Sequence, residues 1–158
     1  MRRPLITGKL AIVLLFILAQ WSTTVLADGL KTDGQTIYVP VYSHIYSGNR
    51  ERTFDLAVTL SIRNTDLVES ISLTAVDYYD SQGKLVKHYL QSSHDLGPMA
   101  SIRYVVKESD TSGGSGANFV VKWNAETSVN PPVIESVMIG TQSQQGISFT
   151  SRGQIISE

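Results

Sequence analysis

Hydrophobic and polar residues alternate most regularly between Thr53 and Arg63. The apolar positions are Phe54, Leu56, Val58, Leu60 and Ile62, and the positions between them are polar or small. A period of two places alternate side chains on opposite faces of an extended strand, whereas a helix would scatter them around its circumference. The pattern therefore predicts a strand with one buried face.

Further strands are predicted wherever short apolar or alternating runs lie between turn signals. These are Thr36–Tyr46, Ile71–Tyr79, Leu85–Gln91, Ser101–Lys107, Asn118–Ala125, Val133–Gly140 and Gly146–Ser151, with a short final strand or a frayed end over Arg152–Glu158. The sequence Asp80–Lys84 contains a glycine and predicts the turn of a β-hairpin. Pro40 predicts an edge position for the first strand, because proline donates no ladder hydrogen bond.

Seven or eight such strands without an amphipathic helix predict an all-β domain. The expected architecture is an antiparallel β-sandwich of the immunoglobulin or fibronectin kind. A closed barrel is the alternative, because the number of strands does not separate the two. We expect one domain over residues 36–158, after a flexible lead-in over residues 28–35. A chain of this length is within the usual size of a single domain.

The N-terminal residues 1–27 predict a helical secretory signal peptide. A positively charged start is followed by the apolar run Leu10–Ala19 and by an exit of small or branched residues that ends at Ala27. These are the three parts of a Sec-type signal, so cleavage is expected between Ala27 and Asp28. An uncleaved anchor is the alternative, but it needs roughly 20 apolar residues, and polar residues interrupt the run from Gln20 onward. The mature protein is expected in the periplasm or the medium, with membrane contact only before cleavage.

Composition excludes several classes of protein. The sequence has no cysteine, which excludes a lipoprotein anchor and any disulfide. Loss of the signal peptide removes three of the 13 basic residues and none of the 14 acidic ones, leaving ten against fourteen and a net charge of −4 with histidine neutral. A mildly acidic chain without basic runs argues against nucleic acid as a partner.

The loop before the strand predicted at Asn118–Ala125 is the most unusual local feature. It reads Asp110-Thr111-Ser112-Gly113-Gly114-Ser115-Gly116-Ala117-Asn118. Such glycines let backbone N–H groups converge on an anion. The loop misses the Gly-x-Ser-x-Gly nucleophile elbow, because Ala117 replaces the second glycine, and it lacks the lysine of a phosphate loop. A tight or flexible connection between two strands is the alternative interpretation.

No catalytic or metal-binding motif is present in the sequence, and neither a cofactor nor a metal is expected. His44, His88 and His94 lack the spacing of metal ligands. Aspartates near the predicted turns could bind Ca²⁺. In turns, however, an aspartate side chain commonly accepts hydrogen bonds from nearby backbone N–H groups, and this is the expected role here.

Several stretches of the mature chain together resemble a known family. They are residues 38–46, 60–65, 76–80, 113–119 and 146–153. The chain is similar in them to the uncharacterised family designated domain of unknown function 3124 (DUF3124), from about Ile37 to Gly153. The resemblance implies a bacterial, exported protein. It brings no biochemical activity, so it supports the domain prediction and leaves the mechanism open.

Two functions from different classes remain. The first is a non-enzymatic binding or accessory module of the cell envelope, whose partner is an envelope protein, a peptide or a glycan. Its candidate ligand-binding residues are Arg63, Asn64, Tyr78, Tyr79, Asp110, Gly113, Gly114, Ser115, Gly116 and Asn118. The arginine would pair with a carboxylate or phosphate, and the tyrosines would supply flat contact area. The second is a small periplasmic hydrolase that uses Ser115 or a bound metal ion, supported by His44 or Asp110.

Overall fold

The computed structural model describes residues 31–142 and 145–157. Its strands are β1 (Thr32–Pro40), β2 (His44–Ser47), β3 (Arg52–Asp55), β4 (Ala57–Arg63), β5 (Ile71–Tyr79), β6 (Leu85–His88), β7 (His94–Leu96), β8 (Ser101–Val106), β9 (Asn118–Val129), β10 (Val133–Gln142), β11 (Gln145–Arg152) and β12 (Gln154–Ser157). The predicted signal peptide and its cleavage site at Ala27 and Asp28 lie outside the described residues. Within the described ranges, no helix is long and apolar enough to cross a membrane.

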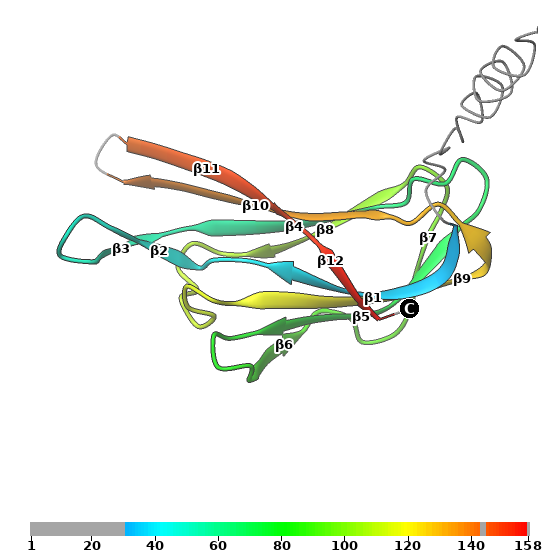
Figure 1. The fold of residues 1–158 in the computed structure, drawn as a ribbon, viewed down its shortest axis with the longest axis horizontal. Helices are drawn as coiled ribbons and strands as arrows, with labels where there is room; N and C mark the ends of the chain where they lie inside the picture. Colours follow the sequence, from blue (N-terminus) through cyan, green and yellow to red (C-terminus); the bar gives the residue numbers. More distant parts are fainter. Residues whose placement is uncertain (1–30, 143–144, 158) are drawn as a thin grey trace, which may run out of the picture.

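Most strands belong to two antiparallel sheets that face each other (Figure 1). The six-stranded sheet has the order β12-β1-β9-β5-β6, and β7 also pairs with β5. The four-stranded sheet has the order β11-β10-β4-β8, and β2 and β3 form a separate hairpin. No pairing between the described strands joins the two larger sheets. The predicted antiparallel β-sandwich is therefore confirmed over the alternative of a closed barrel.

The alternating segment from Phe54 to Ile62 supplies the centre of the core, as predicted. Its five apolar side chains are at most 6% exposed. The structure divides the segment into two strands, because the pairing partner changes within it. β3 pairs with β2, whereas β4 lies between β10 and β8. The alternation thus predicts the buried face correctly but does not show the change of partner.

Inward-facing side chains of the two sheets pack against each other in one core. Its largest fully buried side chains are Tyr78, Phe119, Leu56, Leu60, Ile62, Ile71, Leu73, Met138, Val39, Val41, Val58 and Val76. Full burial of one such aliphatic or aromatic side chain contributes roughly 1.5–3 kcal/mol relative to exposure. Two hydroxyls add bonds between the sheets, since Ser136 Oγ donates to the Pro40 carbonyl at 2.8 Å and Tyr89 Oη donates to the Val105 carbonyl at 3.2 Å.

The first strand differs from its predicted bounds. It begins at Thr32, which pairs with Val129 of β9, so the ordered strand extends into the predicted lead-in. The strand predicted from Thr36 to Tyr46 is divided at residues 41–43 into β1 and β2. The edge position predicted from Pro40 is wrong, because β1 lies between β12 and β9. Proline is tolerated there because β12 pairs with β1 only from Thr36 to Tyr38, so no neighbour on that side needs its N–H.

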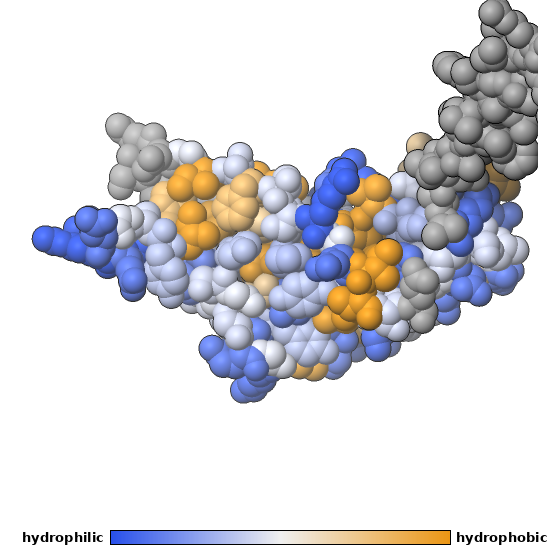
Figure 2. All heavy atoms as spheres, viewed as in Figure 1, coloured by the Kyte–Doolittle hydropathy of each residue, from blue (hydrophilic) through white to orange (hydrophobic). Residues whose placement is uncertain are grey.

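The chain crosses from the four-stranded to the six-stranded sheet at Gly153. Its N–H donates to the Ile134 carbonyl at 2.8 Å, and a Cβ at this position would lie 2.5 Å from a methyl group of Ile37. Glycine therefore allows the close passage between the sheets. β12 then covers one edge of β1. Figure 2 shows apolar surface in this region, where Ile155 and Ile156 are 48% and 57% exposed.

Candidate binding site

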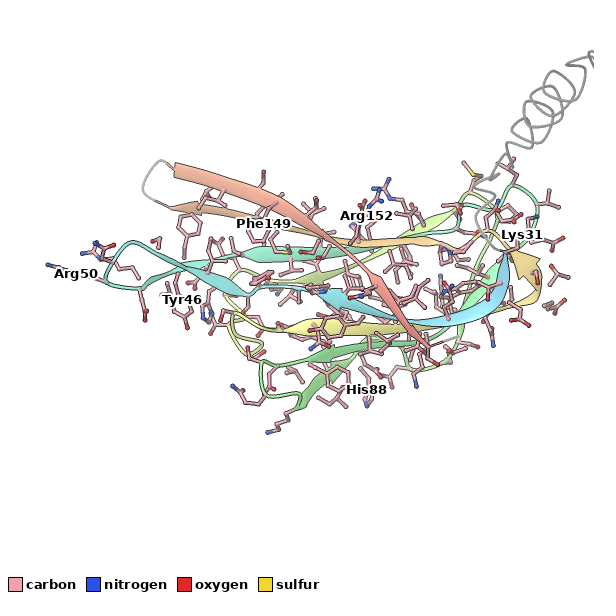
Figure 3. The ribbon with its side chains drawn as sticks, viewed as in Figure 1. Lys31, Tyr46, Arg50, His88, Phe149 and Arg152 are labelled. Atoms are coloured by element: carbon pink, nitrogen blue, oxygen red, sulfur yellow. The ribbon has the colours of Figure 1, made fainter. Side chains whose placement is uncertain are left out.

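The residues that the sequence proposes for one site lie at opposite ends of the sandwich. Lys31 and Arg50 mark the two ends in Figure 3. Asn64 donates a hydrogen bond to the carbonyl of Leu96, and Leu96 pairs with Ile71 at the start of β5. Gly113 instead accepts a hydrogen bond from Ser81, which follows the end of β5. The two groups therefore lie near opposite ends of β5, which has nine residues and rises about 3.3 Å per residue. Arg63 and Asn64 therefore do not share a site with the glycine loop.

The glycine loop is held by neighbouring loops through its own backbone. The N–H and Oγ of Ser81 both donate to the Gly113 carbonyl at 2.9 Å, and Ser81 Oγ accepts the N–H of Gly116 at 2.9 Å. The N–H and Oγ of Ser43 donate to the Gly114 carbonyl at 3.1 and 3.0 Å. These backbone groups are therefore already hydrogen-bonded within the protein. The loop thus fastens the β1–β2 connection to the β5–β6 turn, which is the structural alternative considered for it.

Gly113 is also a packing position, because it lies against Tyr78. Tyr78 has no exposed surface, and a Cβ at Gly113 would overlap its hydroxyl and ring. Burial and, second, the negative charge of Asp110 raise the pKa of Tyr78 to about 12. Tyr78 is therefore a neutral core residue, and its proposed role as a flat contact surface is wrong. Tyr79 and Asn118 are half-buried and pair with each other across β5 and β9.

Ser115 lacks the partners that a nucleophile needs. In the described part of the chain it makes no hydrogen bond with a histidine or a carboxylate. His44 Nε2 instead lies 3.3 Å from Tyr46 Oη, and Asp110 accepts the N–H of Ser112 at 3.1 Å. Across residues 31–142 and 145–157, no three His, Asp or Glu side chains come together as metal ligands. The geometry gives the hydrolase hypothesis no support.

Asn64 is the centre of a buried hydrogen-bond network at the Lys31 end. Its Nδ2 donates to the carbonyls of Glu69, Leu96 and Gly97 at 2.8, 3.1 and 3.0 Å, and its Oδ1 accepts the N–H of Asp66 at 3.0 Å. The residue is 2% exposed. Its polar atoms are therefore occupied by the protein itself and position the surrounding loops, and the residue also lies at the lining of the hollow described below.

Asp66 extends this network to the loop before β10. Its Oδ1 accepts the N–H groups of Val68 and Glu69, both at 3.0 Å, and its Oδ2 accepts the N–H of Asn130 at 3.1 Å. These three backbone donors lower the pKa of Asp66 to about 2. Together, Asn64 and Asp66 fasten the loops after β4, before β8 and before β10 to one another.

The low pKa of Asp66 predicts that acid weakens this end of the domain. The folded pKa of about 2 lies below the ordinary value of 3.8. The ionised carboxylate therefore stabilises the fold fully above about pH 4, and this contribution is lost as the pH falls toward about 2. We expect the urea midpoint of the wild type, followed by tryptophan fluorescence, to fall more steeply over that range than that of Asp66→Asn. Parallel pH profiles of the two proteins would contradict the assignment.

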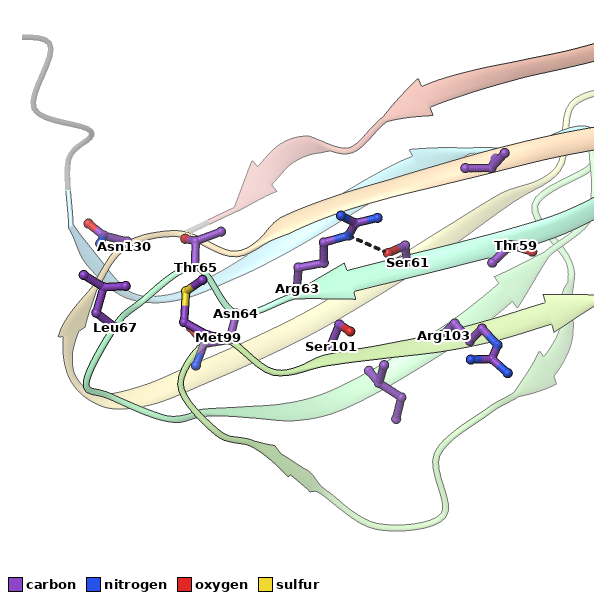
Figure 4. A pocket seen from close by; sticks show the side chains of 12 residues that line it. Thr59, Ser61, Arg63, Asn64, Thr65, Leu67, Met99, Ser101, Arg103 and Asn130 are labelled. Carbon is purple, nitrogen blue, oxygen red and sulfur yellow. Dashed lines mark hydrogen bonds between the residues drawn. The ribbon is translucent and has the colours of Figure 1, made fainter.

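The outer face of the four-stranded sheet is hollowed beside this network (Figure 4). The hollow has a volume of about 910 Å³. Its floor is made by outward-facing side chains of β4, β8 and β10. Its end is made by loop residues that the network holds in place, Thr65, Leu67, Met99 and Asn130. We call this feature the outer hollow.

Hydroxyl and guanidinium groups alternate on the floor of the outer hollow. Ser61 of β4 lies opposite Arg103 of β8, and Arg63 lies opposite Ser101. Arg63 Nε donates to Ser61 Oγ at 3.1 Å, and its Nη2 lies 3.7 Å from Glu135 Oε1. Arg103 is exposed and has no ion pair with any described residue. The floor therefore carries one partly neutralised cation and one unpaired cation.

Two exposed apolar side chains lie at the end of the outer hollow. Leu67 is 74% exposed and Met99 is 66% exposed. Met99 also has a φ of 57°, in the left-handed region that costs a residue with a side chain roughly 1–2 kcal/mol. Its N–H donates to the Asp66 carbonyl at 3.1 Å, so the network holds the strained backbone in place. Met99 is the third residue of a β-turn that the Ala100 N–H closes on the Gly97 carbonyl at 3.1 Å, and a turn with proline at its second position takes a positive φ there.

Sequence reasoning found Arg63 but missed Arg103, Leu67 and Met99. One signal for Arg103 is present in the sequence, because Ile102, Tyr104 and Val106 share the apolar face of their strand and Arg103 must point the other way. Its place beside Ser61 depends on the register between strands that are distant in the sequence. No pattern in a single strand contains that register.

The two packed antiparallel sheets and the outer hollow define a β-sandwich domain with a candidate binding surface on one sheet face. The chain belongs to the family described as Protein of unknown function (DUF3124), whose model matches residues 34–156 and confirms the resemblance seen in the sequence. A search of curated proteins finds no match. The crystal structure of Thermotoga maritima 1070 is similar at 13% identity, covering 76% of this chain and 92% of that chain with a TM-score of 0.46.

Proposed function

We propose that this chain is a non-enzymatic binding module of the cell envelope and that its ligand lies in the outer hollow. The observation that supports this proposal is the composition of that surface. An unpaired Arg103 and two serine hydroxyls line the same hollow as the exposed Leu67 and Met99. Ligand sites typically combine apolar area with a few polar groups that fix orientation, at volumes of roughly 300–1,000 Å³.

The network below the outer hollow adds a second argument. Binding is weakened when loops must become ordered around the ligand, and this cost is small when the loops are already fixed. Asn64 and Asp66 supply seven hydrogen bonds to the backbone of the loops that form the end of the outer hollow. The surface is therefore preorganised in the absence of a ligand.

Export of the protein is part of the same proposal, supported by the signal pattern in residues 1–27. We expect the mature protein to begin at Asp28 and to be found in the periplasm or the medium. Intact mass and N-terminal sequencing of the protein from fractionated cells measure this directly. A protein that keeps Arg2 and stays in the membrane fraction would refute export.

Binding in the outer hollow is tested by protein-observed NMR on ¹⁵N-labelled protein purified from cells that express the full chain. The probes are small organic anions, neutral apolar compounds, short peptides and oligosaccharides. We expect shift changes to cluster at Ser61, Arg63, Ser101 and Arg103. A library without any binder, or binders that cluster instead around Glu126 on the six-stranded sheet, would overturn the proposal.

A matched pair of variants locates the site independently. Arg103→Gln removes the unpaired cation of the outer hollow, whereas Arg50→Gln removes an exposed cation from the β2–β3 connection. A hydrogen bond to a charged group contributes about 1.5–3 kcal/mol, so Arg103→Gln should weaken the binding of anionic probes about tenfold or more. Arg50→Gln should leave it unchanged. Equal effects of the two variants would show that general charge attraction, and not the outer hollow, binds the anions.

A further inference from the structure

We infer that the ligand of the outer hollow is a small amphiphilic carboxylate, of which a medium-chain fatty acid is the simplest form. The inference rests on the proposed function and names the chemical class for that site. In this assignment the carboxylate binds at Arg103 and Arg63, and the apolar chain lies on Leu67 and Met99.

The charges in and around the outer hollow favour an anionic ligand. Arg63 and Arg103 are the charged residues that line it, and Glu135 approaches Arg63 to 3.7 Å from β10. Glu135 compensates part of the two guanidinium charges that line the outer hollow, and Arg152 of β11 lies opposite Glu135 in the register next to it, so this surface keeps a net positive charge. A carboxylate accepts two parallel hydrogen bonds from a guanidinium group.

The register places both arginines on one face of the same strand pair, so that one anionic group can reach both when the Arg63 guanidinium turns from Glu135 of β10. Arg63 and Arg103 occupy diagonal positions of the β4–β8 pair. Diagonal neighbours on one face of an antiparallel pair are about 7–8 Å apart at the backbone, within the reach of long side chains. Ser61 and Ser101 occupy the other diagonal and place hydroxyl donors beside the same point. A headgroup that takes several hydrogen bonds at once fits this arrangement.

The apolar side of the outer hollow requires an apolar part in the ligand. Leu67 and Met99 expose most of their side chains at its end, and the backbone of Met99 is strained at a φ of 57°. Met99 lies in the turn before β8, and Arg103 is the third residue of β8, so the ligand must be long enough to reach along the strand from one feature to the other. A medium-chain carboxylate such as octanoate meets this requirement when the reach of the long arginine and methionine side chains is included. Each CH₂ group that it buries strengthens binding about fourfold.

The test is a calorimetric titration of the protein with four probes. Octanoate carries both features, acetate carries only the carboxylate, 1-octanol carries only the chain, and octyl phosphate carries the chain with a different anion. We expect octanoate to bind at least about tenfold more tightly than acetate and 1-octanol, and more tightly than octyl phosphate. A 1-octanol affinity equal to that of octanoate, or tighter binding of octyl phosphate, would overturn the assignment.

Variants separate binding from folding. Met99→Gly removes the apolar side chain and also relieves the left-handed backbone, so its thermal midpoint should equal or exceed that of the wild type while octanoate binding weakens about tenfold. Leu67→Ser should weaken binding, whereas its neighbour Val68→Ser should not, because Val68 is 75% exposed but lies outside the outer hollow. Unchanged octanoate binding in both Met99→Gly and Leu67→Ser would exclude the apolar contact.

The two levels of the proposal fail in different ways. If octanoate does not bind but NMR probes still cluster at Ser61 and Arg103, the carboxylate assignment is wrong and the binding module stands. If no probe of either experiment binds in the outer hollow, the proposed function itself is wrong. Binding of octanoate that Arg103→Gln leaves unchanged would place the fatty acid elsewhere and would overturn the inference.

Discussion

Gly113→Ala is expected to destabilise the domain by about 3 kcal/mol, at the upper end of the range for overpacking in a core. The new methyl group would overlap the hydroxyl and the ring of Tyr78 and would lie 2.7 Å from the Cβ of Ala117. Neither neighbour can move freely, because Tyr78 is fully buried and its ring centroid lies 5.0 Å from that of Phe119. Urea unfolding followed by tryptophan fluorescence measures the change in the free energy of unfolding.

The Tyr78 hydroxyl supplies a control for this prediction. It is buried without a hydrogen-bond partner, so Tyr78→Phe alone should be neutral or stabilise the domain by up to about 1 kcal/mol. The double variant of Gly113→Ala with Tyr78→Phe should recover part of the loss, because one of the overlapping atoms is gone. Gly97→Ala is the matched control, since no atom lies within 4 Å of its new Cβ. Equal destabilisation by Gly113→Ala and Gly97→Ala would refute the packing role.

Asn64→Ala is expected to destabilise the domain by about 3 kcal/mol, because buried backbone groups that lose their partner cost about 1–3 kcal/mol. The substitution removes three hydrogen bonds that Nδ2 donates to carbonyls and one that Oδ1 accepts from Asp66. Several loops lose their attachment at once. Chemical unfolding at neutral pH measures the loss.

Two further variants test the direction of the Asn64 hydrogen bonds. Asn64→Asp keeps the shape but turns a donor toward three carbonyl oxygens into an acceptor, so it should destabilise the domain at least as much as Asn64→Ala. Asn124→Ala removes an exposed amide from β9 and should change the free energy of unfolding by less than about 0.5 kcal/mol. A tolerated Asn64→Asp would show that the assigned donors are wrong.

The faces of the strands were predictable from the sequence because burial follows a period of two. Phe54, Leu56, Val58, Leu60 and Ile62 are all buried as their alternation predicts. What the pattern lacks is the partner of each strand. The alternation continues through Leu56, although the backbone there leaves the β2–β3 hairpin and enters the four-stranded sheet. Pairing between distant segments is set by the packing of the whole domain, and no local pattern records it.

The candidate site was less predictable, because the same residue types serve ligands and the fold. Asn64 and the glycines at 113 and 114 have the chemistry of ligand-binding residues, but their polar groups are taken by the protein's own backbone. Leu67 and Met99 have the opposite character. They are apolar residues of two loops, and only the structure shows that they are exposed at the end of the hollow that contains Arg103. Whether such a residue serves the fold or a ligand depends on its burial. In a loop, burial follows no regular spacing along the sequence and so cannot be predicted from it.

The pairing of β12 with β1 has a consequence for the order in which the fold is completed. These are the last and the first strands of the described chain, and β12 covers an edge of β1 that no other described strand pairs with. While the chain is still being synthesised from its N-terminus, β1 is available long before β12. An open strand edge is a template for pairing with another chain. The edge of β1 therefore stays open to pairing with another chain until β12 has been made and covers it.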